Sequence, residues 1–202
     1  SALLTDFTTG SQPGYTLSVI GSDGANVSGT TTNGANPNIG TDAYSVFADE
    51  VNMVRYIQGA SGAGFVDLVF GGLTQAELYE VVVYGERSPA TDGRPTQFTI
   101  LGSDDFINSS TLGSDFTGSS DPSVTYDTAP NFDTGYVARF TNIDPGSDGT
   151  FSVRVDQPTG SSQNWYVNAL SFSVVSVPEP SSVVALVMVG GSLLLSKRLS
   201  AK

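Results

Sequence analysis

Short stretches in which apolar and polar residues alternate recur along most of this chain, and they restrict it to a β-rich fold. A period of two is typical of strands that bury one face, and Val, Ile, Phe and Tyr favour the same structure. Clusters of Gly, Asp, Asn, Ser and Pro between the stretches predict turns. We expect strands at residues 15–20, 65–70, 78–84, 96–101, 136–141, 150–155 and 166–174.

These stretches do not alternate with long helical segments, so the strands should pair antiparallel within one domain. We therefore expect an all-β, two-sheet antiparallel β-sandwich, most simply a jelly roll, over residues 1–176. Residues 48–58 fit either a short helix or a strand. The segment 21–43 is rich in Gly, Asn and Thr, which predicts a long surface loop.

The last part of the chain, residues 177–202, forms a different unit. Pro178 and Pro180 precede the apolar stretch 183–195, and Lys197 and Arg198 follow it. The uncharged stretch of about 17 residues is close to the shortest helix that spans a bilayer. We expect one C-terminal apolar α-helix that contacts a membrane at least transiently through residues 181–196, with its basic end on the cytoplasmic side.

The order of these parts resembles the PEP-CTERM sorting signal of bacteria with an outer membrane. The residues that carry the resemblance are Pro178-Glu179-Pro180, the stretch 183–195 and the pair Lys197-Arg198. The resemblance implies an exported protein of the cell surface or extracellular matrix, processed by a membrane protease of the exosortase type. The apolar stretch is short and is broken at Gly190-Gly191, and a plain C-terminal anchor is the alternative. Export also predicts a signal peptide removed before Ser1.

The body of the chain is similar to jelly-roll domains that accompany this sorting signal. Three stretches carry the similarity, namely residues 3–7, 78–94 and 165–170. Such domains resemble carbohydrate-binding modules in fold, and this similarity implies a candidate function in glycan binding. Fold likeness alone does not establish a function.

Charge and composition exclude several functions. The chain has no Cys and no His, which excludes disulfides, Ser–His–Asp triads and zinc sites built on these residues. Residues 1–176 hold five arginines and 19 acidic residues, a net charge near −14. Such a surface repels nucleic acid and anionic lipid headgroups, so we expect no nucleic-acid partner.

Carboxylates are the remaining candidates for chemistry. Neighbouring pairs such as Asp104 and Asp105 fit solvated turns better than a glycosidase, and we expect no enzyme. Asp144 and Asp148 lie in a Gly-rich loop whose oxygen ligands suit calcium, although the loop lacks the spacing of an EF-hand. We therefore expect no cofactor, with a structural calcium ion at this loop as the alternative.

Glycan binding would need aromatic rings beside polar side chains. The candidates are Trp165, Tyr166, Asn164 and Tyr126, although a Trp at a strand end also fits a lid on the core. Arg87 and Arg94 bracket a loop and fit ion pairs with Glu86 and Asp92. Asn26 and Asn108 begin the two Asn-x-Ser/Thr sequences, which are candidates for glycosylation.

Two functions follow from these features. The first is a non-catalytic structural protein of the cell exterior that assembles with copies of itself into filaments or a coat. In that case the apolar helix would pack against other copies, and Gly190, Gly191 and Ser192 would allow close approach. The alternative is an extracellular module that binds polysaccharide and is sorted or anchored by the tail.

Overall fold

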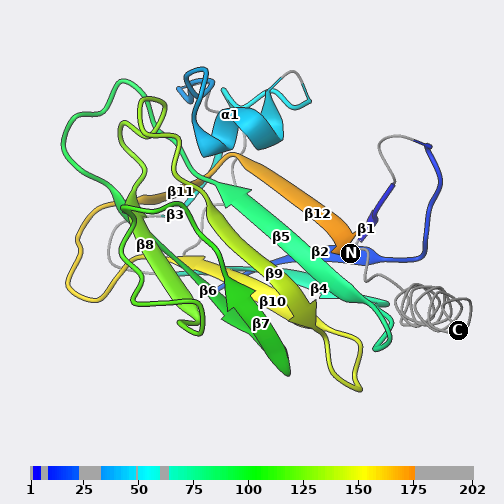
Figure 1. Ribbon diagram of the computed structural model, residues 1–202. Coiled ribbons are helices and arrows are strands. Elements are labelled where there is room, and N and C mark those ends of the chain that lie inside the picture. The colour runs from blue at the N-terminus through cyan, green and yellow to red at the C-terminus, as the bar shows by residue number, and fades with distance from the viewer. Residues whose placement is uncertain (1, 6–8, 23–32, 49, 60–63, 176–202) are drawn as a thin grey trace, which may run out of the picture.

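The computed structural model describes residues 2–5, 9–22, 33–48, 50–59 and 64–175, and most regular structure in these ranges is β-strand (Figure 1). The only helix within them is α1 (Asp42–Phe47). The strands are β1 (Ala2–Leu3), β2 (Thr16–Gly21), β3 (Ile57–Gly59), β4 (Val66–Gly71), β5 (Leu78–Tyr84), β6 (Pro95–Leu101), β7 (Asp105–Asn108), β8 (Ser123–Asp127), β9 (Ala138–Asp144), β10 (Phe151–Asp156), β11 (Trp165–Val167) and β12 (Ala169–Val175).

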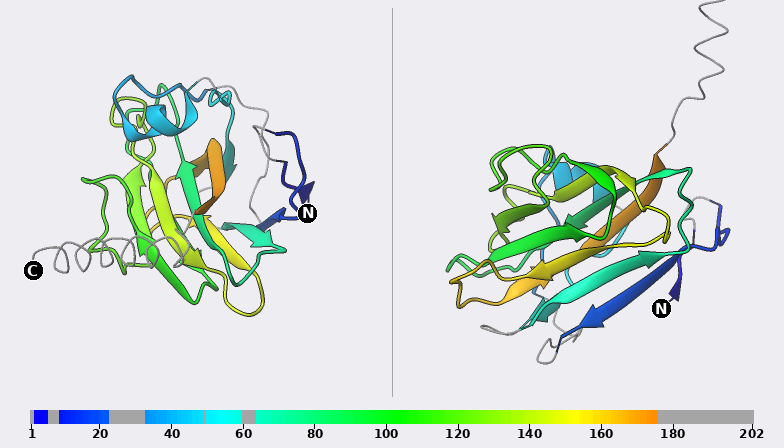
Figure 2. Two further views of the ribbon diagram at one scale, coloured as in Figure 1. Left: turned by 45° about the vertical axis from the view of Figure 1, so that its right-hand side comes forward. Right: turned by 90° about the horizontal axis from the view of Figure 1, so that it is seen from below.

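The strands form two main sheets in which every pair is antiparallel. A six-stranded sheet has the order β1-β2-β4-β10-β6-β8, and a four-stranded sheet has the order β12-β5-β9-β7. β11 and β3 make a separate two-stranded sheet. Figure 2 shows the two main sheets as layers that face each other. Between β4 and β10 the chain changes sheet at every strand, so consecutive strands never pair with each other.

The main core fills the space between these sheets. Alternate residues of β4 and of β10 are buried, as period-two alternation requires. Inward residues of β4 and β10 belong to the same cluster as inward residues of β5 and β9, for example Val153 and Phe140. Phe70 stacks on Phe172 of β12 at 5.0 Å between ring centroids, which joins the two layers. The expected all-β antiparallel sandwich is thus confirmed.

Helix α1 packs against one end of the outer face of the four-stranded sheet. Its buried residues Ala43 and Phe47 pack with Val82 and Tyr84 of β5. The Thr41 hydroxyl accepts a hydrogen bond from the amide of Tyr44 and so caps the first turn. β5 is consequently buried on both faces toward its end, where Val81 to Tyr84 are all inaccessible.

All seven predicted stretches contain strands. Six correspond to β2, β4, β5, β6, β9 and β10, and the stretch 166–174 divides into β11 and β12. The short strands β1, β3, β7 and β8 were not predicted. The interpretation of 48–58 as one regular element was wrong, because this segment is mostly loop and reaches a strand only at β3. The helix α1 begins at Asp42, so only its first two residues fall within the segment 21–43 that we expected to be loop.

The C-terminal tail is not part of the structural description. No helix among the described residues is long and apolar enough to cross a membrane. The expected apolar helix falls outside these residues, as do its flanking motifs. The tail residues concerned are Pro178, Glu179, Pro180, Gly190, Gly191, Ser192, Lys197 and Arg198.

Candidate functional site

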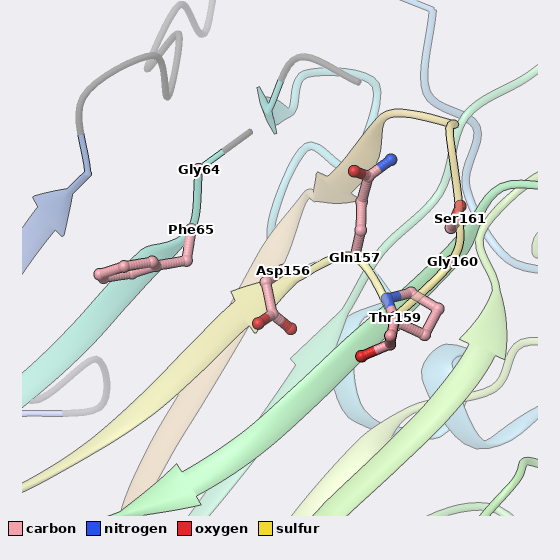
Figure 3. Close-up of a pocket in the computed structure, with 8 residues that line it drawn as sticks. Gly64, Phe65, Asp156, Gln157, Thr159, Gly160 and Ser161 are labelled. Atoms are coloured by element: carbon pink, nitrogen blue, oxygen red, sulfur yellow. The ribbon is translucent and has the colours of Figure 1, made fainter. Parts of the chain in front are cut away.

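A shallow pocket of about 310 Å³ lies at one end of the six-stranded sheet, where β10 ends and its partner β4 begins. Gly64 and Phe65 contribute from the approach to β4, and Asp156 and Gln157 contribute from the end of β10 (Figure 3). The loop 158–161 completes the wall. This volume is at the lower end of the range for small-molecule sites, roughly 300–1,000 Å³.

Asp156 gives the pocket its chemical character. Its Oδ1 atom is buried and has no hydrogen-bond partner among the described residues. Burial raises the pKa of Asp156, the Arg154 guanidinium lowers it, and the Asp67 carboxylate raises it. Because a buried acceptor without a donor is unfavourable, Asp156 is ready to accept a hydrogen bond from water or a ligand hydroxyl.

An ion pair lies beside Asp156 on the outer face of the same sheet. Arg154 of β10 donates from Nε and Nη2 to the two carboxylate oxygens of Asp67 on β4, at 2.8 and 2.9 Å. The Arg154 guanidinium carbon also lies 3.6 Å from the centroid of the Phe65 ring. A bidentate pair and a cation–π contact hold the guanidinium in a fixed position. The pocket therefore adjoins a rigid charged surface.

Trp165 supports the pocket from the core side. Its side chain is fully buried, and its Nε1 donates to the carbonyl of Gly64 at 3.0 Å. A Cβ atom on Gly59, which pairs with Trp165 between β3 and β11, would lie only 2.0 Å from the indole ring. The sequence suggested either a ring for sugars to stack on or a lid on the core for Trp165. Its complete burial fits a lid on the core.

Two other candidate rings are buried as well. Tyr166 is 1% exposed and its hydroxyl accepts a hydrogen bond from Arg94 Nη1 at 3.2 Å. Tyr126 is 4% exposed and its hydroxyl donates to the carbonyl of Val83. A stacking platform needs an exposed ring face, and neither ring has one. Asn164 lies partly exposed in the loop that enters β11.

The predicted arginine pairs differ in outcome. Arg94 pairs with Asp92 at 2.9 Å, as expected. Arg87 does not pair with Glu86, because the Glu86 carboxylate points into the protein and accepts hydrogen bonds from the amides of Asn131 and Phe132. Burial is the main cause that raises the pKa of Glu86 to about 7, and its Oε1 atom has no partner among the described residues.

The proposed calcium ligands act within turns. Asp144 Oδ1 accepts the amide hydrogen of Gly146 at 2.9 Å, and Asp148 Oδ1 accepts that of Thr150 at 3.2 Å. These bonds are those of ordinary Asx turns. Within the described part of the chain, no group of three or more carboxylates is arranged to hold a metal ion.

Asn108 is unsuited to glycosylation in the folded protein. It is 2% exposed, and its side-chain amide donates to the carbonyls of Asp121 and Ser123. A glycan on this nitrogen would break both bonds and displace β7 from its surroundings. Asn26, the other candidate, lies outside the described residues.

Sequence reasoning missed the pocket because its parts are distant along the chain. Phe65 and Asp156 come together only through the register of β4 and β10, in which Asp67 lies opposite Arg154. The nearest signal was Asp156 itself, a carboxylate that ends a strand and precedes a loop of small and polar residues.

Comparisons with known proteins identify no family. Neither the scan of family models nor the searches of curated proteins and of solved structures found a match to this chain.

Proposed function

We propose that this protein is a non-catalytic, exported module that binds an extracellular saccharide through the Asp156 pocket. The observation that carries this proposal is the buried, unpartnered Oδ1 of Asp156 beside a pocket of small-ligand size. The trio Trp165, Tyr166 and Tyr126, which the sequence offered as candidates for the same function, is buried.

The chemistry of the pocket suits a polyhydroxylated ligand. Asp156 and Gln157 supply a carboxylate and an amide, and Thr159 and Ser161 supply hydroxyl groups. Sugars present many hydroxyls that both donate and accept, so mixed polar groups of this kind satisfy them. Asp67 is occupied by its bidentate bond to Arg154, which argues against a second free carboxylate for glycoside hydrolysis.

The proposed location and fold come from the tail and the strand order. The resemblance of residues 177–202 to a sorting signal supports export, processing by an exosortase-type protease and display at the cell surface or in the matrix. We also propose that the sandwich is a jelly roll. The alternation between sheets, with orders β4-β10-β6-β8 and β5-β9-β7, supports that topology.

Calorimetric titration of the protein with a panel of neutral oligosaccharides tests the binding proposal. Asp156→Asn should weaken binding about ten-fold or more, because a hydrogen bond to a charged group contributes about 1.5–3 kcal/mol. Asp148→Asn removes the same charge from an exposed turn and should leave the affinity unchanged. Equal affinities of the two variants, or no binding by the wild type across the panel, would contradict the proposal.

Self-assembly is a second candidate function, favoured by exposed apolar side chains on the first two strands. Leu3, Val19 and Ile20 are 52%, 44% and 53% exposed. Because these side chains are already about half buried, burial of the rest between copies contributes roughly 0.8–1.5 kcal/mol each, and the apolar tail would add to this. Electron micrographs of full-length protein and of a variant without residues 181–202 distinguish the roles. Particles that disappear only in the variant would support assembly through the tail.

A further inference from the structure

Arg87 lies in an unusual setting at the end of β5. Its guanidinium carbon is 5.9 Å from the ring centroid of Tyr56 and 6.0 Å from that of Tyr166. These two rings meet edge to face at 5.0 Å, so they form a firm corner against which the guanidinium packs. Arg94 approaches the same Tyr166 ring at 5.9 Å. Two of the five arginines of residues 1–176 therefore converge on one tyrosine.

The charge of Arg87 has no counter-ion within the described residues. Arg94 pairs with Asp92 and Arg154 with Asp67, whereas the one side-chain hydrogen bond of Arg87 to a described residue runs from Nη1 to the carbonyl of Ser88 at 3.1 Å. Its Nε atom is buried and has no hydrogen-bond partner in this part of the chain. A half-buried cation that lacks a carboxylate partner is uncommon in a domain with such an excess of acidic residues.

An oxyanion is the partner that this arrangement lacks. A guanidinium can donate two parallel N–H groups to one carboxylate. On Arg87 these are the N–H groups of Nη2 and the second N–H of Nη1, because Nε is buried and Nη1 uses only one N–H on Ser88. The net charge near −14 of residues 1–176 repels a polyanion strongly, because each of its charges is repelled. A ligand with a single negative charge is repelled much less. An isolated carboxylate therefore fits better than an acidic polymer or a nucleic acid.

We infer that Arg87, held by Tyr56 and Tyr166, is a subsite for the carboxylate of a singly charged sugar acid. The inference rests on the proposed function in one respect, namely that the ligand is a sugar. The subsite is distinct from the Asp156 pocket, because Arg87, Tyr56 and Tyr166 are not among the residues that line that pocket. The guanidinium of Arg94 is bound to Asp92 and so is not available to the ligand. Arg94 instead positions Tyr166, to whose hydroxyl it donates a hydrogen bond.

The test pairs each uronic acid with its neutral parent sugar, using glucuronate with glucose and galacturonate with galactose. Binding is measured by calorimetry, and the Nε–H resonance of Arg87 is followed by NMR. We expect at least one uronate to bind about ten-fold tighter than its parent and to shift this resonance, because bidentate charged hydrogen bonds form only with the acid. Arg87→Gln should abolish the difference between acid and parent.

Arg139→Gln is the matched control, because it removes the same charge from β9. This variant should keep the preference for the acid. Equal affinity for both members of every pair, or equal effects of the two variants, would overturn the inference while leaving the Asp156 proposal intact. Conversely, Asp156→Asn should not change the Arg87 resonance shift. Uronate binding without any binding of neutral sugars would retain the Arg87 subsite and overturn the pocket proposal. Absence of binding by every sugar overturns both.

Discussion

The buried carboxylate of Glu86 should make the protein less stable as pH rises from 5 to 8. The side chain is fully inaccessible, and burial raises its pKa from the ordinary 4.5 to about 7 in the folded protein. The folded state therefore holds a proton that the unfolded state loses. A raised folded pKa contributes stability that is fully present below the unfolded value and is lost as pH rises through the folded value.

The magnitude follows from these two values. At pH 5 the Glu86 carboxyl of the unfolded chain, with an ordinary pKa of 4.5, is already mostly ionised, whereas in the folded protein it ionises only near pH 7. The free energy of unfolding should fall by roughly 2–3 kcal/mol between about pH 5 and pH 8, since one pKa unit corresponds to about 1.4 kcal/mol. Burial of Asp156 raises its pKa and acts in the same direction.

Glu86→Gln isolates this contribution. A glutamine keeps a side-chain oxygen that can accept from the amides of Asn131 and Phe132 but carries no charge at any pH. The variant should therefore match the wild type near pH 5 and exceed it in stability at pH 8, with a flatter dependence between them. Glu50→Gln, an exposed change of the same kind, should reproduce the wild-type curve.

Urea denaturation at pH 5, 6, 7 and 8 measures these differences. The midpoint and slope give the free energy of unfolding at each pH. The reasoning fails if the wild type is as stable at pH 8 as at pH 5, or if Glu86→Gln has the same pH dependence as the wild type. It also fails if Glu86→Gln is less stable than the wild type at pH 8.

Three further changes have defined outcomes. Trp165→Ala should lower the free energy of unfolding by about 3–5 kcal/mol, because it leaves a large cavity in the core. A much smaller loss, measured by urea denaturation, would contradict this. Gly59→Ala should be destabilising in the wild type but much less so beside Trp165→Ala, since its Cβ would overlap the indole; additive effects in a double-mutant cycle would disprove the contact. Asp67→Asn should lower the unfolding free energy by about 1 kcal/mol or less, because the pair with Arg154 is partly exposed; a loss of several kcal/mol in thermal denaturation would not fit.

The sequence predicted strands well where one face of a strand is buried and the other is not. β4 and β10 alternate over their full lengths, and their stretches were found within one residue at each end. β8 also alternates, but its buried residues Val124 and Tyr126 are too few to stand out among polar neighbours. β7, with Asp and Asn at its ends, carries even less signal.

The division of the last predicted strand has a specific cause in Asn168. The main-chain N–H of Asn168 donates to the carbonyl of Tyr84. Its side-chain Oδ1 accepts from the main-chain N–H of Glu86, and its Nδ2 donates to the carbonyl of Met53. These tertiary bonds turn the chain from β11 into β12, and an alternating pattern contains no sign of them. Helix α1 was findable, because Thr41 followed by Asp42 is a usual helix start, but six residues give too short a period to recognise.

The candidate site was less predictable than the fold. Trp165 and Tyr166 were candidates for glycan contact, with a lid on the core as the other interpretation of Trp165, and both are buried. The sequence could not predict their burial, because an aromatic residue at a strand end can lie equally well in a core or on a surface. Among the described residues, Asp156 Oδ1 has no hydrogen-bond partner and Arg87 has no counter-ion. The sequence could not predict either feature, because both depend on which residues the fold brings close together.

The exchange of strands between the two sheets determines when the protein can fold. β10 lies between β4 and β6, and β9 and β12 lie on either side of β5. In a chain that has been made only as far as β6, β4 can therefore pair with β2, but none of the partners of β5 and β6 has yet been synthesised. Contacts of this kind are distant in sequence, so folding should be slow and should start only when the last third of the body is present. Until then the apolar faces of β5 and β6, which belong to the main core, have no complete opposite sheet to pack against.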